Sequence, residues 1–424
     1  MSGAAARRWA AVSLVCLATV LVGWWSKARC LDGGWTAGEQ YLEWCYTDVY
    51  PLWYAERLDA GAVPYLDHPV EYPVLTGAQM WAAAQAAQRF PPPARARVFY
   101  HVTAALGAVF AVGVLALLGW AGLGPARAAW WAAAPTLAAY AFLNWDPAAV
   151  FLLTLAVVLH LRGHDGWAGV AAGLGAAAKL FPAVVVPVVV AARLAQRAPR
   201  AALAHMAAAA ASWTLVNLPV AMLAWEGWWH FFALNRARPA NWDSLWYFAG
   251  RVLGLRVSLP ALNLWSAVLL LTGAAVIVAV GTRKSPPERW WRLVLPLLCW
   301  FLLVNKVYSP QYSLWLLPLM ALALPRAAPF AAFLAADLMV FATEFPFLAG
   351  VDQGTAAPGY GVLAFALLAR AGVLAWVVGL CLVTDAGAYD GPPRLRAAPP
   401  RRGGRPLRAQ RVAQGPDLSL RRAG

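Results

Sequence analysis

The chain has 424 residues, of which 62% are hydrophobic and 12% charged, and its mean hydropathy is +0.58. A soluble domain could not cover so much apolar surface, so the composition indicates transmembrane helices, and the absence of period-two alternation argues against a β-barrel. The net charge of +15 does not point to nucleic acid, because nine arginines are concentrated in the last 40 residues.

The first predicted element is a membrane helix over about 9–25, preceded by Arg7 and Arg8. It resembles a signal peptide, but it lacks a small-residue cleavage site and is long enough to span, so we expect it to be retained. Since basic residues favour the cytoplasmic side, the following loop, 26–96, is predicted to be extracytoplasmic.

This first loop contains two amphipathic stretches, about 48–60 and 75–90, which we predict to be interfacial helices. It also contains Cys30 and Cys45. A disulfide between them could form if the loop lies in an oxidising compartment, and it would hold the segment that follows.

Beyond the loop, eleven further apolar segments predict an all-α polytopic membrane protein of about 12 transmembrane helices, with both termini cytoplasmic. The membrane domain is predicted to cover 1–384, and 385–424 to form a basic, disordered cytoplasmic tail. The later spans are expected at about 97–119, 128–143, 147–161, 166–178, 181–195, 201–223, 259–281, 290–304, 311–324, 327–345 and 359–384.

Four polar islands interrupt this apolar pattern, and the predicted topology puts all of them at the outer ends of helices. Polar groups at membrane depth persist where they face a cavity or a substrate. The islands are Asp48 with its loop, 144–146, 179–182 and 305–312.

Asp48 is the candidate catalytic residue. A transferase whose leaving group is a phosphate needs one base for the incoming hydroxyl and no acid for departure, so a single carboxylate suffices. The alternative is that Asp48 caps the helix that begins near Pro51.

Two lysines at the ends of apolar helices, Lys179 and Lys306, are candidates to hold a lipid phosphate and stabilise its departure. The alternative is that both reach the membrane interface by snorkelling. Arg57 and His68 are weaker candidates for the same anion.

Several other polar residues are candidates for sugar or acceptor binding, each with a structural alternative. Aromatic and amide side chains could bind a sugar or form an interface belt. Asn144 and Asp146 could orient a sugar or a lysine, or they could cap the helix that starts at Pro147. Tryptophans at 225–246 suit sugar faces and lipid interfaces equally, and Asp337 with Arg370 indicates a buried ion pair. The candidates are Tyr308, Gln311, Tyr312, Glu71, Asn144 and Asp146.

Several signatures are missing. The sequence has no phosphate-binding glycine-rich lysine loop, no zinc-type spacing and no Asp-x-Asp pair for a metal-bound sugar nucleotide, and His160, His164 and His205 are scattered. We therefore expect no metal and no cofactor, and a lipid-phosphate sugar rather than a sugar nucleotide as donor.

The same segments give the chain a resemblance to a known group. It resembles the integral-membrane GT-C glycosyltransferases, and within them glycosyltransferase family 87, which includes polyprenol-phosphate-mannose-dependent α-mannosyltransferases of actinobacteria. The resemblance covers most of the membrane domain but not the basic tail. It is carried by Cys45-Tyr-Thr-Asp48, Tyr65–Gly77, Asn144-Trp-Asp146, Ala178-Lys-Leu-Phe-Pro182 and Lys306-Val-Tyr-Ser-Pro-Gln-Tyr312.

The resemblance implies that Asp48 is the base and that a polyprenyl-phosphate-linked hexose, mannose first, is transferred with inversion and without metal. The implied acceptor is a glycan or glycolipid of the cell envelope, at the outer face of the plasma membrane. The alternatives are a polyprenyl-phosphate-arabinose-dependent transferase, or a lipid or sugar transporter. A transporter predicts midplane polar residues and an internal repeat, which the sequence does not show.

Overall fold

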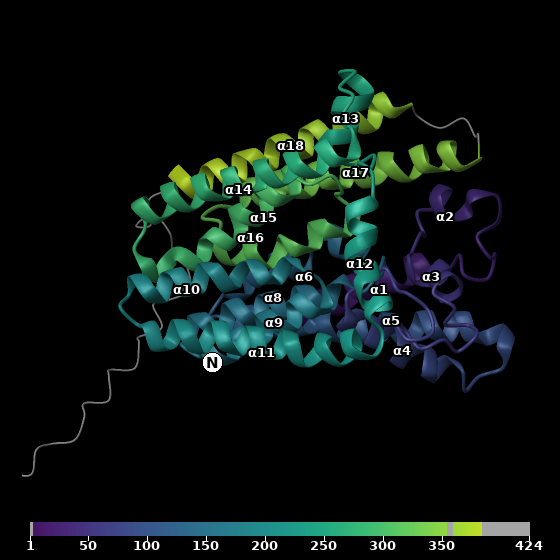
Figure 1. Ribbon diagram of the computed structural model, residues 1–424, viewed down its shortest axis with the longest axis horizontal. Coiled ribbons are helices and arrows are strands. Elements are labelled where there is room, and N and C mark those ends of the chain that lie inside the picture. Colours follow the sequence, from purple (N-terminus) through teal and green to yellow (C-terminus); the bar gives the residue numbers. More distant parts are fainter. Residues whose placement is uncertain (1–2, 354–358, 384–424) are drawn as a thin grey trace, which may run out of the picture. The chain divides into compact units, whose positions relative to one another are not determined.

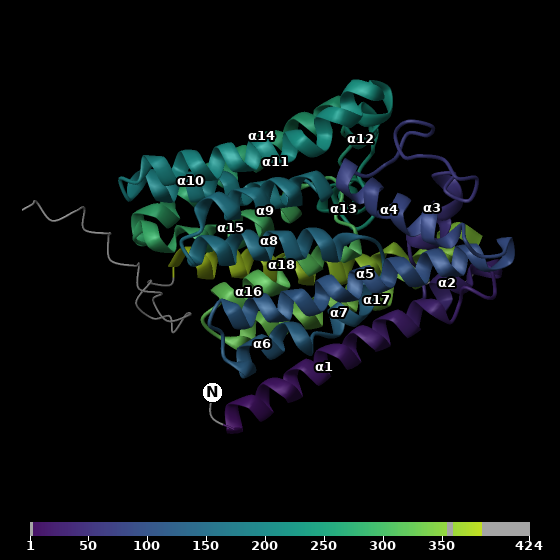
Figure 2. The same cartoon turned by 90° about the horizontal axis from the view of Figure 1, so that it is seen from below.

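The computed structural model describes residues 3–353 and 359–383, and the regular elements in this part of the chain are all helices (Figures 1 and 2). The predicted tail, 385–424, lies outside the described residues. The α-helices are α1 (Gly3–Ala28), α2 (Glu39–Leu42), α3 (Val49–Ala55), α4 (Val74–Ala87), α5 (Pro92–Trp120), α6 (Pro125–Ala132), α7 (Pro135–Tyr140), α8 (Asp146–Leu161), α9 (Asp165–Ala178), α10 (Val185–Ala195), α11 (Pro199–Leu223), α12 (Trp225–Ala237), α13 (Leu245–Val252), α14 (Leu259–Lys284), α15 (Val294–Val304), α16 (Leu317–Ala323), α17 (Ala327–Gln353) and α18 (Tyr360–Val383), and the 3₁₀ segments are η1 (Thr36–Gly38), η2 (Phe181–Val184), η3 (Pro287–Leu293) and η4 (Pro310–Trp315).

Six of the described helices, α1, α5, α11, α14, α17 and α18, are long and apolar enough to cross a membrane. The other predicted spans appear as shorter helices or as pairs of short segments, such as α6 with α7 and η4 with α16. Proline explains several of these breaks, because Pro135, Pro182 and Pro310 start new helical segments rather than continue old ones. The all-helical class is therefore confirmed, and the count of 12 spans stays a prediction.

Small residues set the closest helix packing. In α9, Gly169 and Gly173 are four residues apart and face α11, where a Cβ atom at either position would overlap the backbone carbonyl of His205 or Ala209. Glycine lets the two backbones approach in the way that small-xxx-small pairs do in membrane helices. In both views, α8 lies beside α9, and α17 beside α18 (Figures 1 and 2).

Asp165, the first residue of α9, ties neighbouring helices together. Its carboxylate accepts a hydrogen bond from Arg193 Nε at 2.9 Å and lies 3.0 Å from His160 Nδ1. Its carbonyl oxygen lies 3.0 Å from His205 Nδ1. Two of the histidines that look scattered in the sequence thus join α8 and α11 to the start of α9, and Arg193 joins α10 to it.

The segment between α1 and α5 is the predicted first loop, and it is largely ordered by covalent and backbone ties. Cys30 and Cys45 form a disulfide across 15 positions of sequence. The predicted stretches 48–60 and 75–90 contain α3 and α4, and α4 packs on α5 and α9 rather than standing apart from the bundle. These contacts hold the loop against α5 and α9.

Candidate functional site

A cavity of about 420 Å³ lies among the first loop, α12, η4 and the C-terminal part of α17. This volume falls within the range of small-molecule sites. Both charged groups and aromatic rings form its wall. The side chains used below that line it are Tyr46, Asp48, Glu71, Tyr72, Lys179, Phe231, Arg238, Trp242, Gln311, Tyr312, Glu344 and Phe345.

Asp48 is held in the cavity wall by a backbone hydrogen bond of its own and by a side-chain hydrogen bond of Thr47. The Asp48 amide donates to the Leu143 carbonyl at 2.7 Å, and the Thr47 hydroxyl donates to the Phe142 carbonyl at 2.7 Å. The residue stands at the N-terminus of α3, but its side chain makes no capping hydrogen bond. The capping alternative for Asp48 therefore has no support in the geometry, and the carboxylate is left for the cavity.

Three side chains donate to the half-buried Asp48 carboxylate. The Tyr46 hydroxyl donates to Oδ1 at 2.8 Å, and longer contacts reach Oδ2 from the Tyr72 hydroxyl at 3.4 Å and from Asn144 Nδ2 at 3.5 Å. Burial raises the pKa of the Asp48 carboxyl to about 6, although the Tyr46 hydrogen bond opposes the rise. A carboxylate with a pKa near neutrality can accept a proton more effectively than a fully solvated one.

Lys179 directly follows α9 and lines the cavity, as expected of a lysine predicted to bind a phosphate. Its ammonium pairs with the buried Asp146 carboxylate, and it also lies 4.8 Å from the centre of the Tyr312 ring and 5.6 Å from that of Tyr72. Trp315 Nε1 donates to the second Asp146 oxygen at 2.7 Å. The lysine is therefore fixed between a carboxylate and ring faces, with its charge at the cavity wall.

Asn144 makes hydrogen bonds both to the start of α8 and to the side chains around Asp48. Its side-chain oxygen accepts from the Asp146 amide at 2.9 Å at the start of α8, while its Nδ2 contacts Asp48 and the Tyr72 hydroxyl. Neither Asn144 nor Asp146 lines the cavity. They orient the residues that do, Asp48 and Lys179.

Lys306 does not lie on the cavity wall. Its ammonium donates to the Arg238 carbonyl at 2.7 Å and to Asn263 Oδ1 at 2.6 Å, with a longer contact to the Arg236 carbonyl at 3.2 Å. The lysine thus satisfies free carbonyls at the end of α12 and joins them to α14. The sequence prediction that Lys179 and Lys306 form one phosphate cradle is not matched by their positions.

Two weaker phosphate candidates are also placed elsewhere. Arg57 is exposed at the end of the α3 segment, and His68 Nε2 lies 3.7 Å from the buried Glu56 carboxylate. Glu56 in turn accepts from the Glu71 amide at 3.2 Å. His68 and Glu56 therefore support Glu71, which does line the cavity.

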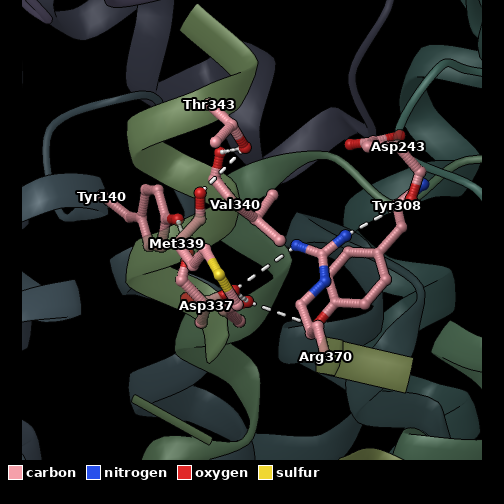
Figure 3. Close-up of polar contacts among 9 residues, drawn as sticks. Tyr140, Asp243, Tyr308, Asp337, Met339, Val340, Thr343 and Arg370 are labelled. Carbon is pink, nitrogen blue, oxygen red and sulfur yellow. Dashed lines mark hydrogen bonds and ion pairs between the residues drawn. The ribbon is translucent and has the colours of Figure 1, made fainter. Parts of the chain in front are cut away.

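Tyr308 does not line the cavity and belongs to a buried network around Arg370 (Figure 3). The Arg370 guanidinium lies 3.6 Å from the centre of its ring and 3.4 Å from Asp337 Oδ1. Arg370 also donates to the Asp243 carbonyl at 3.3 Å, and the Ser313 hydroxyl donates to Asp337 at 2.6 Å. The structure has the Asp337–Arg370 pair expected from the sequence, and it joins α17 and α18 to η4.

Of the predicted site residues, the cavity thus brings together Asp48, Glu71, Lys179, Gln311 and Tyr312. Sequence reasoning missed two charged residues on the same wall, Arg238 and Glu344. A signal existed for Glu344, since it is an acid within an apolar helix. None existed for Arg238, because nothing in the sequence separates it from Arg236 nearby.

Among the residues that the structure describes, no cluster of three or more His, Cys, Asp or Glu is arranged to hold a metal ion. No protein-family model matches the chain, and no curated protein matches it. In the part of the chain that the structure describes, fold and site define a class: an all-helical protein with six helices suited to a membrane, carrying a polar, aromatic-lined cavity.

Proposed function

We propose that this protein is a GT-C-type membrane glycosyltransferase of the plasma membrane. It moves a hexose, mannose first, from a polyprenyl-phosphate donor to a glycan or glycolipid of the cell envelope, with inversion. Under this proposal the chain has about 12 spans, both termini are cytoplasmic and the cavity opens to the extracytoplasmic face. The observation that carries the proposal is Asp48, a carboxylate with a pKa raised to about 6 on the wall of a cavity that also has cations.

The geometry supports a single-displacement step. Asp48 accepts the proton of an acceptor hydroxyl, whose oxygen attacks the anomeric carbon of the donor. The bond from that carbon to the phosphate oxygen breaks, and polyprenyl phosphate leaves with the electron pair. Lys179 and Arg238 stand on the same wall to stabilise the negative charge that grows on the phosphate.

A strip of mainly apolar and aromatic side chains beside the cavity supports a lipid donor. It shares Tyr72, Pro73 and Phe231 with the cavity wall and continues past Trp228 and Phe232. Beyond it, α11 exposes Leu215, Met222 and Leu223, among other large apolar side chains. An isoprenoid chain attached to a phosphate in the cavity would have an apolar path along these residues.

The decisive experiment measures sugar transfer by the purified protein in nanodiscs. Radiolabelled polyprenyl-phosphate-mannose is supplied with a panel of mannoside acceptors, with and without EDTA, beside the Asp48→Asn variant. Product from the wild type alone, unchanged by EDTA, supports the donor class and the metal-independent step together. If no mannoside is extended while polyprenyl-phosphate-arabinose is used, the sugar is wrong and the class stands. Transport of an unmodified lipid or sugar without product would contradict the proposal.

Removing the Tyr46 hydroxyl should move the acid limb of activity to higher pH. Tyr46 donates to the charged form of Asp48 and so lowers its pKa, and Asp48 works only when deprotonated. In Tyr46→Phe the pKa of Asp48 therefore rises, by about one unit for a lost hydrogen bond to a charge. Transfer should fall most at pH 6 and little at pH 8. The pH profile of kcat/KM measures this.

A matched control for this variant is Tyr54→Phe, since Tyr54 is half exposed and makes no hydrogen bond to Asp48. Its acid limb should coincide with that of the wild type. An unshifted limb in Tyr46→Phe would show that Asp48 does not control the profile.

Arg238→Gln should weaken binding of polyprenyl phosphate, by up to about tenfold, because an arginine on the cavity wall can donate two hydrogen bonds to one phosphate. Arg236→Gln is the control, since Arg236 is an exposed arginine two positions earlier that does not line the cavity. Equilibrium binding at several salt concentrations measures both. Equal losses in the two variants would indicate a general surface charge effect and count against a phosphate site.

A further inference from the structure

Glu344 is a carboxylate that the catalytic step does not use. It lies on α17, seven residues after Asp337, so two helical turns put the two acids on the same side. It lines the cavity, yet it is only 1% exposed. Its Oε1 accepts from Trp242 Nε1 at 3.0 Å, whereas no donor among the described residues reaches Oε2.

The nearby guanidinium does not account for Glu344. Figure 3 shows Arg370 directed at Asp337 and the Asp243 carbonyl, with its plane against Tyr308. Within the described part of the chain, no ion pair closer than 4.0 Å involves Glu344. Buried acceptors in folded proteins nearly always have a donor, so the missing donor needs an explanation.

A second acceptor in the same cavity is also without a donor. Gln311, in η4, is 5% exposed, lines the cavity and has no described hydrogen-bond partner for Oε1. Two acceptors from different elements thus share one cavity. Neither a phosphate oxygen nor an apolar chain could satisfy them, because neither donates; a group of hydroxyls could.

The surroundings fit a sugar ring rather than a lone hydroxyl. The Trp242 indole that holds Glu344 is itself part of the cavity wall, and flat ring faces pack on sugar rings. Phe345, next to Glu344, lies 5.9 Å from the Tyr46 ring, whose hydroxyl donates to Asp48. One ring contact, between Phe345 and Tyr46, and one hydrogen bond, from Tyr46 to Asp48, therefore connect the neighbour of Glu344 to the residue that we propose as the base.

We propose that Glu344, positioned by Trp242 and joined by Gln311, binds hydroxyl groups of a hexose in the cavity. This inference rests on the proposed function and adds a sugar subsite to it. The hydroxyls belong either to the donor sugar or to the acceptor sugar, and binding measured with one substrate at a time separates the two sources.

The test compares the wild type with Glu344→Gln, an isosteric change that keeps an oxygen for Trp242 to donate to. Binding is measured in nanodiscs by tryptophan fluorescence for three probes: polyprenyl-phosphate-mannose, polyprenyl phosphate and a free mannoside acceptor. No probe reacts alone. We expect binding of one sugar-bearing probe to weaken by up to about tenfold, as for a lost hydrogen bond, while polyprenyl phosphate binds as before. The probe that weakens identifies the source.

Asp352→Asn is the control, because it makes the same acid-to-amide change at an exposed position of α17. Thermal unfolding of both variants checks the fold, and a series of deoxy-mannosides gives a second measurement. Removal of the hydroxyl that binds Glu344 should weaken mannoside binding about tenfold in the wild type and little in Glu344→Gln.

Three outcomes would overturn the inference. Unchanged binding of both sugar-bearing probes, with Asp48→Asn still inactive, would make Glu344 structural and leave the proposed function intact. Equal weakening of polyprenyl phosphate would show a general disturbance of the cavity. A wild type that binds no sugar-bearing probe would remove the proposed function and the subsite together.

Discussion

Asp48→Asn is expected to lower the rate of sugar transfer by about 10²–10⁴-fold while leaving donor binding and folding intact. An asparagine keeps the shape of the side chain and can still accept from the Tyr46 hydroxyl, which donates to Oδ1 at 2.8 Å. It cannot take a proton from an acceptor hydroxyl. Single-turnover transfer with saturating donor measures the chemical step, and donor binding is measured separately.

The control is Asp59→Asn, an exposed carboxylate in the same loop that does not line the cavity. It should transfer at the rate of the wild type. If Asp48→Asn kept its activity, the assignment of Asp48 as the base would be wrong. If it lost donor binding in the same proportion as rate, Asp48 would have a binding role rather than a chemical one.

Lys179→Met is expected to act on both stability and transfer. The variant leaves the buried Asp146 carboxylate without its cation, and breaking such a pair costs about 3–5 kcal/mol of stability. The loss of a charge that stabilises the departing phosphate should lower the rate by about 10²–10³-fold. Thermal unfolding and transfer, measured on the same preparation, report the two effects.

The double variant Lys179→Met with Asp146→Asn separates the structural and the chemical role of the lysine. Both charges are then gone, and the introduced amide oxygen can still accept from Trp315 Nε1, so stability should largely return. Transfer should stay low. Recovery of transfer together with stability would show that Lys179 serves only as the partner of Asp146.

The sequence predicted site residues best where a charged side chain stands out against a neighbouring apolar segment. The apolar spans predicted an all-helical membrane protein, and Asp48 stood out because no helical bundle needs a carboxylate there. Lys179 was found in the same way, as a charge at the end of an apolar helix. The structure places both on one cavity wall.

The positions that the sequence did not separate depend on how distant segments meet. Lys306 and Lys179 look alike in the sequence. In the structure, however, the Lys306 ammonium donates hydrogen bonds to two carbonyls at the end of α12 and to a side-chain oxygen of α14. Arg238 reaches the cavity because that same helix end is held there. Glu344 has its role only through Trp242, which lies 102 positions away along the chain. Such relations arise from tertiary contacts and leave no local pattern.

The Cys30–Cys45 bridge has a use beyond holding the loop that leads to Asp48. Disulfides persist on the oxidising side of a membrane, so the two thiols can act as a native reporter of sidedness without any added tag. The other cysteines of the chain, Cys16, Cys299 and Cys381, are free, and the first two are buried in the fold. Because both bridge sulfurs are buried, the bridge is read after denaturation. Protein from acid-quenched cells should react with a maleimide at its three free cysteines if the loop faces the oxidising side, and at all five if it faces the reducing cytoplasm.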